Sequence, residues 1–381
     1  MRGLDLLVLS EVKWNYLRTR KRFLISHFPG DTRVLFLQPI SFSLPNNFLP
    51  KREGNVTFLS TPVLKPRTES KFYNRLVEFR ALRCLLGVII VLWVRLAMLL
   101  LGFKTNVTVL VSNVYFAPVI ERLKSNFVCY DCNDDPTVFP GVREWSKNYF
   151  RRTCRRADVT VACSESLARR IAPACGGRVS VIGNGVDYEL FSRNVTAAEL
   201  PGDISSVKPP IVGYTGAIRE WFDFELVEQA ATSNPEASFV LIGPVAPSVR
   251  DEARRLATER PNVHLLGEKT YESLPIYLWP MEVCLIPFKL GPLTSVLNPN
   301  KLYEYFAAGK TVVSLKYSED LAKYEGLLYL VDEPTQFPEA VSEALRRPIE
   351  PDRVRDVASG NSWRSKAGEF FDVLETGRRG E

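Results

Sequence analysis

Residues 298–310 read NPNKLYEYFAAGK, and the fold of this chain is predicted most directly by working outward from them. Asparagine is a favourable N-cap, proline suits the first helical position and Gly309 suits a helix C-terminus, so a short helix is predicted. Apolar runs at 283–288 and 311–315 predict a buried strand on either side. The helix therefore begins just past the carboxyl end of a strand, where open α/β sheets bind ligands.

The start of this predicted helix carries two charged residues on one face. Free backbone N–H groups there can hold an anion, and Lys301 adds a positive charge. Glu304 follows one turn later on the same face, with a carboxylate that can accept two hydroxyl hydrogen bonds. A nucleoside diphosphate offers both an anionic diphosphate and a pair of ribose hydroxyls, so the stretch could bind one. The alternative interpretation is an ordinary Lys–Glu pair on the helix surface.

The composition indicates a globular protein with an uneven charge distribution. At 381 residues, with 46% hydrophobic and 24% charged residues, the chain is long enough for two ordinary domains. The net charge is +6, but residues 1–200 carry +13 and residues 201–381 carry −7. The N-terminal half therefore favours an anionic partner, for which we expect a membrane surface rather than nucleic acid.

Seven scattered cysteines and the lack of a secretory signal peptide predict reduced thiols in a cytoplasmic protein. Cys129 and Cys132 are spaced like zinc ligands. Because no second pair or histidine cluster completes such a site, no metal site is predicted.

Two α/β regions are predicted along the chain. Strands at 4–9, 33–37, 107–112, 158–163 and 179–182 alternate with helices, which indicates a parallel sheet. The loop after the first strand lacks a Gly-x-Gly-x-x-Gly motif, so no dinucleotide fingerprint is present. A loop rich in proline and glycine reaches residue 210, and a second alternating region follows. We expect domains at 1–190 and 209–350, with a helical stretch at 352–378 packing back on the first.

Residues 84–103 are nearly unbroken in their hydrophobicity, interrupted only by Arg95, and this length would cross a bilayer. A charge near the middle opposes a crossing. A crossing would also place the strands before and after the segment on opposite sides of the membrane, so that they could not share a sheet. Two interpretations remain open: a helix packed on the sheet, and a helix that dips into one face of a membrane.

Three carboxylates follow a predicted strand in the first region: Asp131, Asp134 and Asp135. Such a group at a strand's carboxyl end is typical of a functional site, although turns also favour aspartate. The helix predicted over 142–156 carries six bases, which indicates either a lipid-facing surface or a solvated charged face.

The chain resembles the retaining nucleotide-sugar glycosyltransferases of the GT-B fold, in the large family often called family 4. The resemblance is specific as an ordered set of segments and spans most of 128–346. The segments are VSVIGNGVDYELF (179–191), IVGYTGAIREWFD (211–223), FVLIGP (239–244), NVHLLG (262–267), YESLP (271–275), VCLIPF (283–288) and NPNKLYEYFAAG (298–309).

The resemblance implies an α/β protein with two Rossmann-like domains facing each other across a cleft. The N-terminal domain would bind the acceptor and the C-terminal domain a UDP- or GDP-sugar, without metal or cofactor. Glu304 would hold the ribose hydroxyls, Lys301 the diphosphate, and backbone near Gly267 and Tyr271 the base. The implied donor-binding residues are Gly216, Arg219, Gly243, Gly267, Tyr271, Asn298, Lys301, Leu302 and Glu304, and the implied acceptor-side residues are Trp14, Arg20 and Asp131.

The chain departs from the family pattern at several charged positions. The first of the family's two glutamates falls on Val296, and its diphosphate-binding Arg and Lys fall near Ala217 and Phe222. Arg219 and Lys301 are the available replacements. The frequent N-domain histidine is also absent, so we expect Asp134 or Asp135 to orient or deprotonate the acceptor hydroxyl. A carboxylate base leaves retention versus inversion open.

The leading prediction is a metal-independent, hexosyltransferase-like glycosyltransferase that extends a lipid-linked or saccharide acceptor in polysaccharide or glycolipid synthesis. It would be cytoplasmic and peripheral on the inner face of the membrane. The alternatives are a transferase with a soluble acceptor, a catalytically silent GT-B subunit that scaffolds a partner, and a sugar-nucleotide epimerase.

Overall fold

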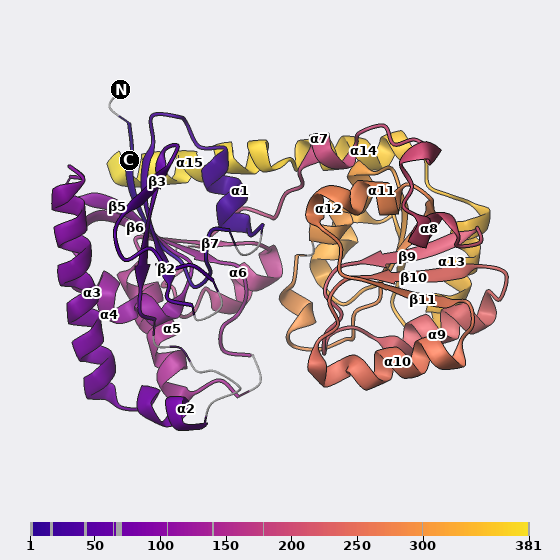
Figure 1. The fold of residues 1–381 in the computed structure, drawn as a ribbon, viewed down its shortest axis with the longest axis horizontal. Coiled ribbons are helices and arrows are strands. Elements are labelled where there is room, and N and C mark those ends of the chain that lie inside the picture. Colours follow the sequence, from indigo (N-terminus) through magenta and orange to yellow (C-terminus); the bar gives the residue numbers. More distant parts are fainter. Residues whose placement is uncertain are drawn as a thin grey trace. The chain divides into compact units, whose positions relative to one another are not determined.

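The computed structural model describes residues 3–15, 18–41, 44–63, 65, 71–104, 106–138, 141–177, 179–298 and 300–379. The chain divides into two compact units (Figure 1). The first comprises Met1–Ile182 and Ala367–Glu381, and the second comprises Gly183–Lys366. Each unit contains one sheet covered by helices, so the predicted α/β class with two parallel-sheet domains is confirmed.

The first unit is built on an eight-stranded sheet in the order β3-β4-β2-β1-β5-β6-β7-β8. All neighbouring pairs are parallel except β3 and β4. The central strands β1 and β5 are buried along their whole length, as expected of a parallel sheet with both faces covered. Their bounds are β1 Asp5–Leu9, β2 Arg33–Pro39, β3 Lys51–Glu53, β4 Val56–Thr61, β5 Val107–Val111, β6 Ser125–Cys132, β7 Val159–Ala162 and β8 Val179–Val181.

Helices join the parallel strands of the first unit. The main ones are α1 Arg20–Ser26, α2 Lys71–Val77, α3 Arg80–Leu100, α4 Ala117–Ile120, α5 Glu144–Arg156 and α6 Glu165–Ile171. Because β1 pairs with both β2 and β5, the chain before α3 and the chain after it lie in one sheet. A membrane crossing by α3 is incompatible with that pairing, as the sequence indicates.

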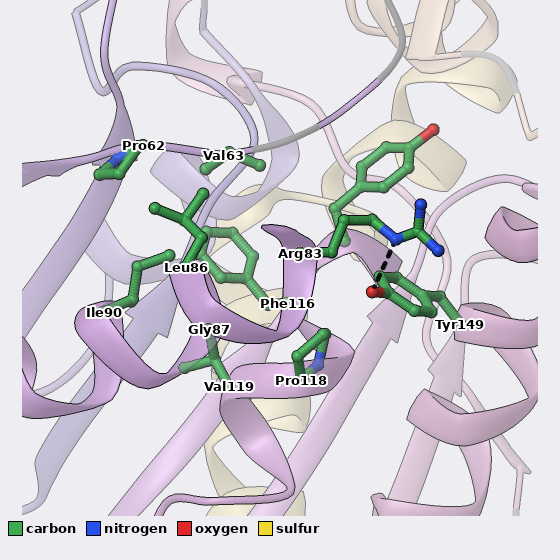
Figure 2. Close-up of a pocket in the computed structure, with 11 residues that line it drawn as sticks. Pro62, Val63, Arg83, Leu86, Gly87, Ile90, Phe116, Pro118, Val119 and Tyr149 are labelled. Carbon is green, nitrogen blue, oxygen red and sulfur yellow. Dashed lines mark hydrogen bonds between the residues drawn. The ribbon is translucent and has the colours of Figure 1, made fainter. Parts of the chain in front are cut away.

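One face of α3 packs on α4, close to α5. A Cβ atom at Gly87 would lie 2.9 Å from Cβ of Pro118, so glycine allows the two helices to approach closely. Figure 2 shows this packing, with Arg83 pointing toward Tyr149 in α5. The Arg83 Nε donates to the Tyr149 hydroxyl at 3.1 Å, and its Nη1 donates to the carbonyl of Val77 at the end of α2. These contacts fix the inner face of α3 to the first unit.

The last helix, α15 (Trp363–Arg379), begins in the second unit and contributes residues from Ala367 onward to the first. Phe370 is fully buried, and its ring centroid lies 6.4 Å from that of Phe28. At Gly377, a Cβ atom would lie 2.1 Å from the ring of Phe127 in β6. The helical stretch expected at 352–378 is thus two helices, of which α14 (Pro351–Gly360) belongs to the second unit.

The second unit contains a six-stranded parallel sheet in the order β11-β10-β9-β12-β13-β14. In chain order this is the 3-2-1-4-5-6 arrangement of doubly wound nucleotide-binding folds, whose direction reverses between β9 and β12. The strands are β9 Ile211–Thr215, β10 Ser238–Ile242, β11 Val263–Gly267, β12 Met281–Ile286, β13 Thr311–Leu315 and β14 Tyr329–Val331.

The helices of the second unit include α9, which packs on α13, and α12, which packs on α14. Their bounds are α7 Tyr188–Phe191, α8 Gly202–Ser205, α9 Phe224–Ser233, α10 Arg250–Glu259, α11 Leu274–Leu278, α12 Asn300–Ala307 and α13 Phe337–Arg346. The predicted glycine stop of α12 is confirmed: Gly309 has φ +69° and its N–H donates to Phe306 O at 2.9 Å. The helix begins at Asn300, and Pro299, its predicted first residue, lies outside the described residues.

Candidate functional site

Three adjacent strands of the second unit end in glycines with positive φ: Gly216 after β9 (+137°), Gly243 after β10 (+147°) and Gly267 at the end of β11 (+71°). The Gly216 N–H donates to Ile242 O at 2.8 Å, and the Gly243 N–H donates to Gly267 O at 2.9 Å. A Cβ atom at Gly243 would lie 2.0 Å from the Gly216 carbonyl oxygen. Only glycine permits this contact, so bare backbone forms the carboxyl edge here.

Lys301, in the first turn of α12, lies over this backbone. A Cβ atom at Gly216 would lie 2.2 Å from its Cε, and Nζ is 5.4 Å and 5.5 Å from the ring centroids of Tyr214 and Phe288. Burial lowers the pKa of Lys301, and the charge of Glu304 opposes this effect. Within the described ranges, no hydrogen bond or ion pair reaches the ammonium group. Lys301 is therefore a half-buried cation that faces the strand reversal without an anionic partner.

Glu304 lies one turn along α12 and is 8% exposed. Burial raises the pKa of its carboxyl group to about 7, against the opposing effects of the Lys301 charge and a hydrogen bond from Tyr271. The ring of Tyr271 packs edge-on against Phe191, with centroids 5.3 Å apart. Tyr271 thus connects the loop after β11 to Glu304, and the two residues predicted to meet the base and the ribose lie together.

The other predicted residues at the start of α12 contribute differently. The carbonyl of Asn298 accepts a 2.7 Å hydrogen bond from Asn184, while its buried Oδ1 has no partner among the described residues. The same holds for Oδ1 of Asn300. Leu302 is 1% exposed and packs in the core, so only its backbone N–H remains to meet a ligand.

The positions where charged residues were expected are apolar and mostly buried. Val296 is 3% exposed and Phe222 is fully buried, and the carbonyl of Ala217 accepts a hydrogen bond from Tyr214. Arg219 is exposed, with its guanidinium 5.7 Å from the ring centroid of Trp221. Arg219, the predicted replacement for the missing cations, thus lies over an aromatic ring. No described contact joins it to Lys301.

The first unit has its own strand reversal, between β1 and β5. Here both Glu11 carboxylate oxygens lie 2.6 Å from Nζ of Lys21, which is 1% exposed, and the Ser112 hydroxyl donates to Glu11 at 2.9 Å. Burial alone would raise the pKa of Glu11, but the Lys21 charge and these hydrogen bonds lower it. This group is a fully paired ionic cluster, and the sequence interpretation missed it.

Asp131 and Arg20, both predicted on the acceptor side, form a buried ion pair. Asp131 is fully buried, and its Oδ1 lies 3.1 Å from Nε of Arg20. The Arg20 guanidinium also donates to Ile182 O at 2.8 Å, which connects β6 to the end of β8. The second Asp131 oxygen has no partner among the described residues. The geometry of this pair indicates a positioning role.

The two predicted catalytic aspartates differ in their surroundings. Asp135 is 3% exposed, contacts Arg170 at 2.6 Å and accepts hydrogen bonds from the N–H and hydroxyl of Thr137. Asp134 keeps more than a third of its surface exposed. The surrounding protein and then the charge of Glu11 raise the pKa of Asp134 to about 6. Asp134 is therefore the better placed of the two to exchange a proton near neutral pH.

Trp14 packs edge-on against Phe36, with ring centroids 5.2 Å apart, and the Arg22 guanidinium lies 5.8 Å from its ring centroid. It also lines a hollow beside β2 and β4. An aromatic ring next to amide and charged groups is suited to binding a sugar. The lining residues are Lys13, Trp14, Asn15, Gln38, Leu44, Pro45, Asn47, Lys51, Glu53 and Phe58.

Among the described residues, no group of three or more histidines, cysteines or acidic side chains could hold a metal ion. All seven cysteines are free, and the sulfur atoms of Cys154 and Cys175 lie 2.7 Å apart. The aromatic residues beside Lys301 were missed from the sequence. Their signal is the tyrosine in Tyr214-Thr-Gly216, which precedes the glycine turn.

Two family comparisons each match one part of the chain and leave residues 191–208 between them, whereas the chain passes from the first unit to the second between Ile182 and Gly183. Residues 48–190 match the family described as Glycosyltransferase Family 4, and residues 209–347 match Glycosyl transferases group 1. The chain is 29% identical over 209 residues to TuaH of Bacillus subtilis (strain 168), a glycosyltransferase named for a role in teichuronic acid biosynthesis. That match covers 51% of this chain and 52% of the relative, so the chain spans about half the length of the curated relative.

Solved structures share the fold over nearly the whole chain. A trehalose-6-phosphate protein from E. coli bound with UDP-2-fluoro glucose has a TM-score of 0.72 at 13% identity, covering 97% of this chain and 99% of that one. HepE of Anabaena in complex with UDP has a TM-score of 0.66 at 15% identity, covering 98% and 100%. A UDP-forming trehalose-phosphate synthase from Burkholderia xenovorans has a TM-score of 0.71 at 14% identity, covering 99% of each chain.

Proposed function

This chain belongs to the family 4-like glycosyltransferases of the GT-B fold, and from that premise we propose that it moves a sugar from a UDP- or GDP-sugar to an acceptor hydroxyl. The observation that carries the proposal is Lys301, a half-buried cation without an anionic partner among the described residues, lying over glycine-ended strands. A diphosphate would supply the missing negative charge. Two fold relatives bound to UDP or a UDP-sugar support a UDP donor.

In this proposal each residue around Lys301 has a defined task. The bare backbone at Gly216 and Gly243 lets the diphosphate approach, and Lys301 stabilises the negative charge that grows on it as the glycosidic bond breaks. The ionised Glu304 carboxylate accepts hydrogen bonds from the ribose hydroxyls. Tyr271 holds Glu304 in place and lies beside the base. The transfer is proposed to need neither metal nor cofactor.

On the first unit, we assign the acceptor base to Asp134, because Asp135 is held by Arg170 and Thr137. A carboxylate with a pKa of about 6 is mostly ionised at pH 7 and can take a proton from a hydroxyl as it attacks the sugar. Arg20 and Asp131 position the end of β6, and Trp14 offers a ring to the acceptor. The Asp134→Asn variant should lose about 100-fold in transfer rate while donor binding stays unchanged. Full transfer by this variant would rule out the assignment.

We propose a lipid-linked acceptor in polysaccharide or glycolipid synthesis, at the cytoplasmic face of a membrane. The named role of the Bacillus relative supports polysaccharide synthesis. The charge of +13 on residues 1–200 supports an anionic surface. A soluble saccharide acceptor is the competing assignment, and it predicts equal transfer rates with and without lipid on the acceptor.

The donor assignment is tested by thermal shift with UDP-, GDP- and ADP-sugars. A ligand that binds only the folded protein raises its melting temperature. At a ligand concentration of about 100 times Kd, the free energy of unfolding rises by about 2.7 kcal/mol. We expect a shift with one nucleotide class, lost in Lys301→Ala but kept in Lys310→Ala. Lys310 is a matched control because it lies just past the same helix, with Nζ donating to Trp279 O at 2.8 Å.

One observation favours a second function, that of a silent GT-B subunit. Val296 and Phe222 place buried apolar side chains where the family pattern has charges. A wild-type chain that gives no shift with any nucleotide sugar would support this scaffold role and overturn the transferase proposal.

A further inference from the structure

One face of α3 is apolar and exposed along the whole helix. Its outer positions expose between 37% and 75% of their surface, and they recur every three or four residues: Leu82, Leu85, Val88, Ile89, Leu92, Leu96, Leu99 and Leu100. Phe79, just before the helix, is 60% exposed. At 1.5 Å per residue this face extends for about 30 Å. A continuous apolar strip of this length on a soluble surface indicates a binding face.

The opposite face is fully engaged with the first unit. Its buried residues are Arg83, Gly87, Ile90, Val91, Val94, Ala97 and Met98. Figure 1 shows α3 along the outside of this unit. The inner face of α3 is fixed to the first unit, and the strands before and after α3 in the chain belong to one sheet. The helix can therefore meet a membrane only along its side.

The charge around α3 is positive. Between residues 71 and 130, Glu78 and Glu121 are the only acidic residues in the sequence, and each is paired, with Arg143 and Arg152 respectively. Six exposed bases lie in or near α3: Arg75, Arg80, Arg95, Lys104, Arg122 and Lys124. The Arg95 guanidinium donates to Arg122 O at 2.9 Å, just past the end of α4. A rim of bases beside an apolar strip fits anionic lipid headgroups above acyl chains.

The chemistry of the strip favours lipid over a protein partner. Across α3, which is described throughout, the exposed polar side chains are those of Arg80 and Arg95. Protein interfaces combine apolar area with aromatic and hydrogen-bonding groups that specify the partner. A strip of aliphatic side chains carries little such information, whereas acyl chains require none. Trp93 is half-buried beside the strip, as expected of a residue at the headgroup level.

We propose that the first unit docks on an anionic lipid bilayer through the outer face of α3, which lies in the plane of the membrane and does not cross it. By length and composition, α3 is the one described helix that could span a membrane, with a mean hydropathy of 2.2 over its best window. In the chain α3 follows β4 and precedes β5, and both strands belong to one sheet, so the helix would lie in the plane of the membrane. The inference rests on the proposed function in one respect: a lipid-linked acceptor would be collected from the surface on which the unit rests.

The test compares vesicle binding of the wild type with a double variant, Leu92→Asp/Leu96→Asp. Both side chains are at least 45% exposed, so the fold should tolerate the change. The vesicles contain phosphatidylglycerol and phosphatidylcholine in equal parts. The control is Leu290→Asp in the second unit, where the leucine is 53% exposed. We expect the wild type and the control to co-sediment with vesicles and the double variant to bind at least 10-fold more weakly.

A second measurement does not depend on a disruptive substitution. Leu92→Trp adds a fluorophore to the strip, and Leu290→Trp adds one to the control site. With vesicles that contain brominated acyl chains, quenching beyond that of the wild type is expected only for Leu92→Trp. Equal quenching at both positions, or none at either, would overturn the insertion of α3.

Two other outcomes would also reject the proposal. A wild-type chain that fails to bind vesicles would leave the strip without a lipid partner. A lipid-free dimer that the double variant converts to a monomer would identify the strip as an interface between copies. Donor binding by thermal shift separates this proposal from the transferase proposal: the double variant should keep its donor shift, whereas a wild type without any shift would reject the transferase assignment alone.

Discussion

Both units carry a lysine and a glutamate at the point where the strand order reverses, but they use them in opposite ways. In the first unit Lys21 and Glu11 contact each other at 2.6 Å, and Ser112 completes the set. In the second unit Lys301 and Glu304 share a helix face without forming an ion pair within 4.0 Å. A paired cluster stabilises the fold, whereas an unpaired one keeps its charge for a ligand. The same two residue types therefore mark a structural site in one unit and a candidate binding site in the other.

The largest expected effect is on stability in the first unit. Lys21→Met leaves the Glu11 carboxylate without its partner in a confined site, which should lower the free energy of unfolding by about 3 kcal/mol. Lys301→Met should change it by less than about 1 kcal/mol, because no pair is broken. Urea unfolding of both variants tests the contrast, and similar losses would contradict it. The double variant Lys21→Met/Glu11→Gln should recover part of the loss.

The second effect is on donor affinity. Lys301→Ala removes a charged donor to the diphosphate, worth about 1.5–3 kcal/mol, so the affinity should fall by about 10- to 100-fold. Lys21→Met should leave the donor affinity unchanged in the fraction that remains folded. Titration calorimetry with the nucleotide sugar from the thermal-shift screen provides the measurement. Unchanged donor affinity in Lys301→Ala would contradict the assignment of Lys301 to donor binding, and with it the difference between the two units.

The third effect is a pH dependence centred on Glu304. Its folded pKa of about 7 lies above the ordinary value of 4.5, so the folded state holds the proton more tightly. The stability that this group contributes is present below pH 4.5 and is lost as pH rises toward 7. Ribose binding needs the ionised form, so donor affinity should rise by up to about 10-fold between pH 6 and 8. Glu304→Gln should bind donor more weakly and show no such rise.

The smallest effect concerns Arg219, which sharpens the comparison by testing whether a second cation serves the donor. Arg219 is exposed, and an exposed cation paired with an anionic group contributes at most about 1 kcal/mol. Arg219→Ala should therefore lower donor affinity by less than about 5-fold. A loss as large as that of Lys301→Ala would show that Arg219 moves from Trp221 to the diphosphate.

Local features of the site could be predicted from the sequence, whereas the contacts between strands could not. The glycine stop of α12 and the shared face of Lys301 and Glu304 follow from helical geometry alone. The family resemblance implies Leu302 as a donor-binding residue, but the step of one residue from Lys301 rotates its side chain by about 100° and turns it into the core.

The satisfied cluster in the first unit depends on pairing that periodicity does not reveal. Ser112 and Glu11 are 101 residues apart and meet because β1 and β5 are neighbours. The place of Asp131 at a strand end predicts a site residue. In the structure it forms a buried ion pair with Arg20, which is 111 residues away in the sequence. Only the strand order tells which carboxylates are matched by a base and which, like Asp134, remain accessible.

The contribution of α15 to the first unit also bears on how the protein is made. Residues 367–379 are synthesised after the entire second unit, yet Phe370 belongs to the core of the first. At about 5–20 residues per second, the ribosome would need roughly 10–40 seconds to add the intervening segment. During that time the nascent first unit lacks the helix that covers Phe28 and Phe127. The first unit thus leaves the ribosome before the second but is completed after it, and chaperones have a defined surface to protect until α15 has been made.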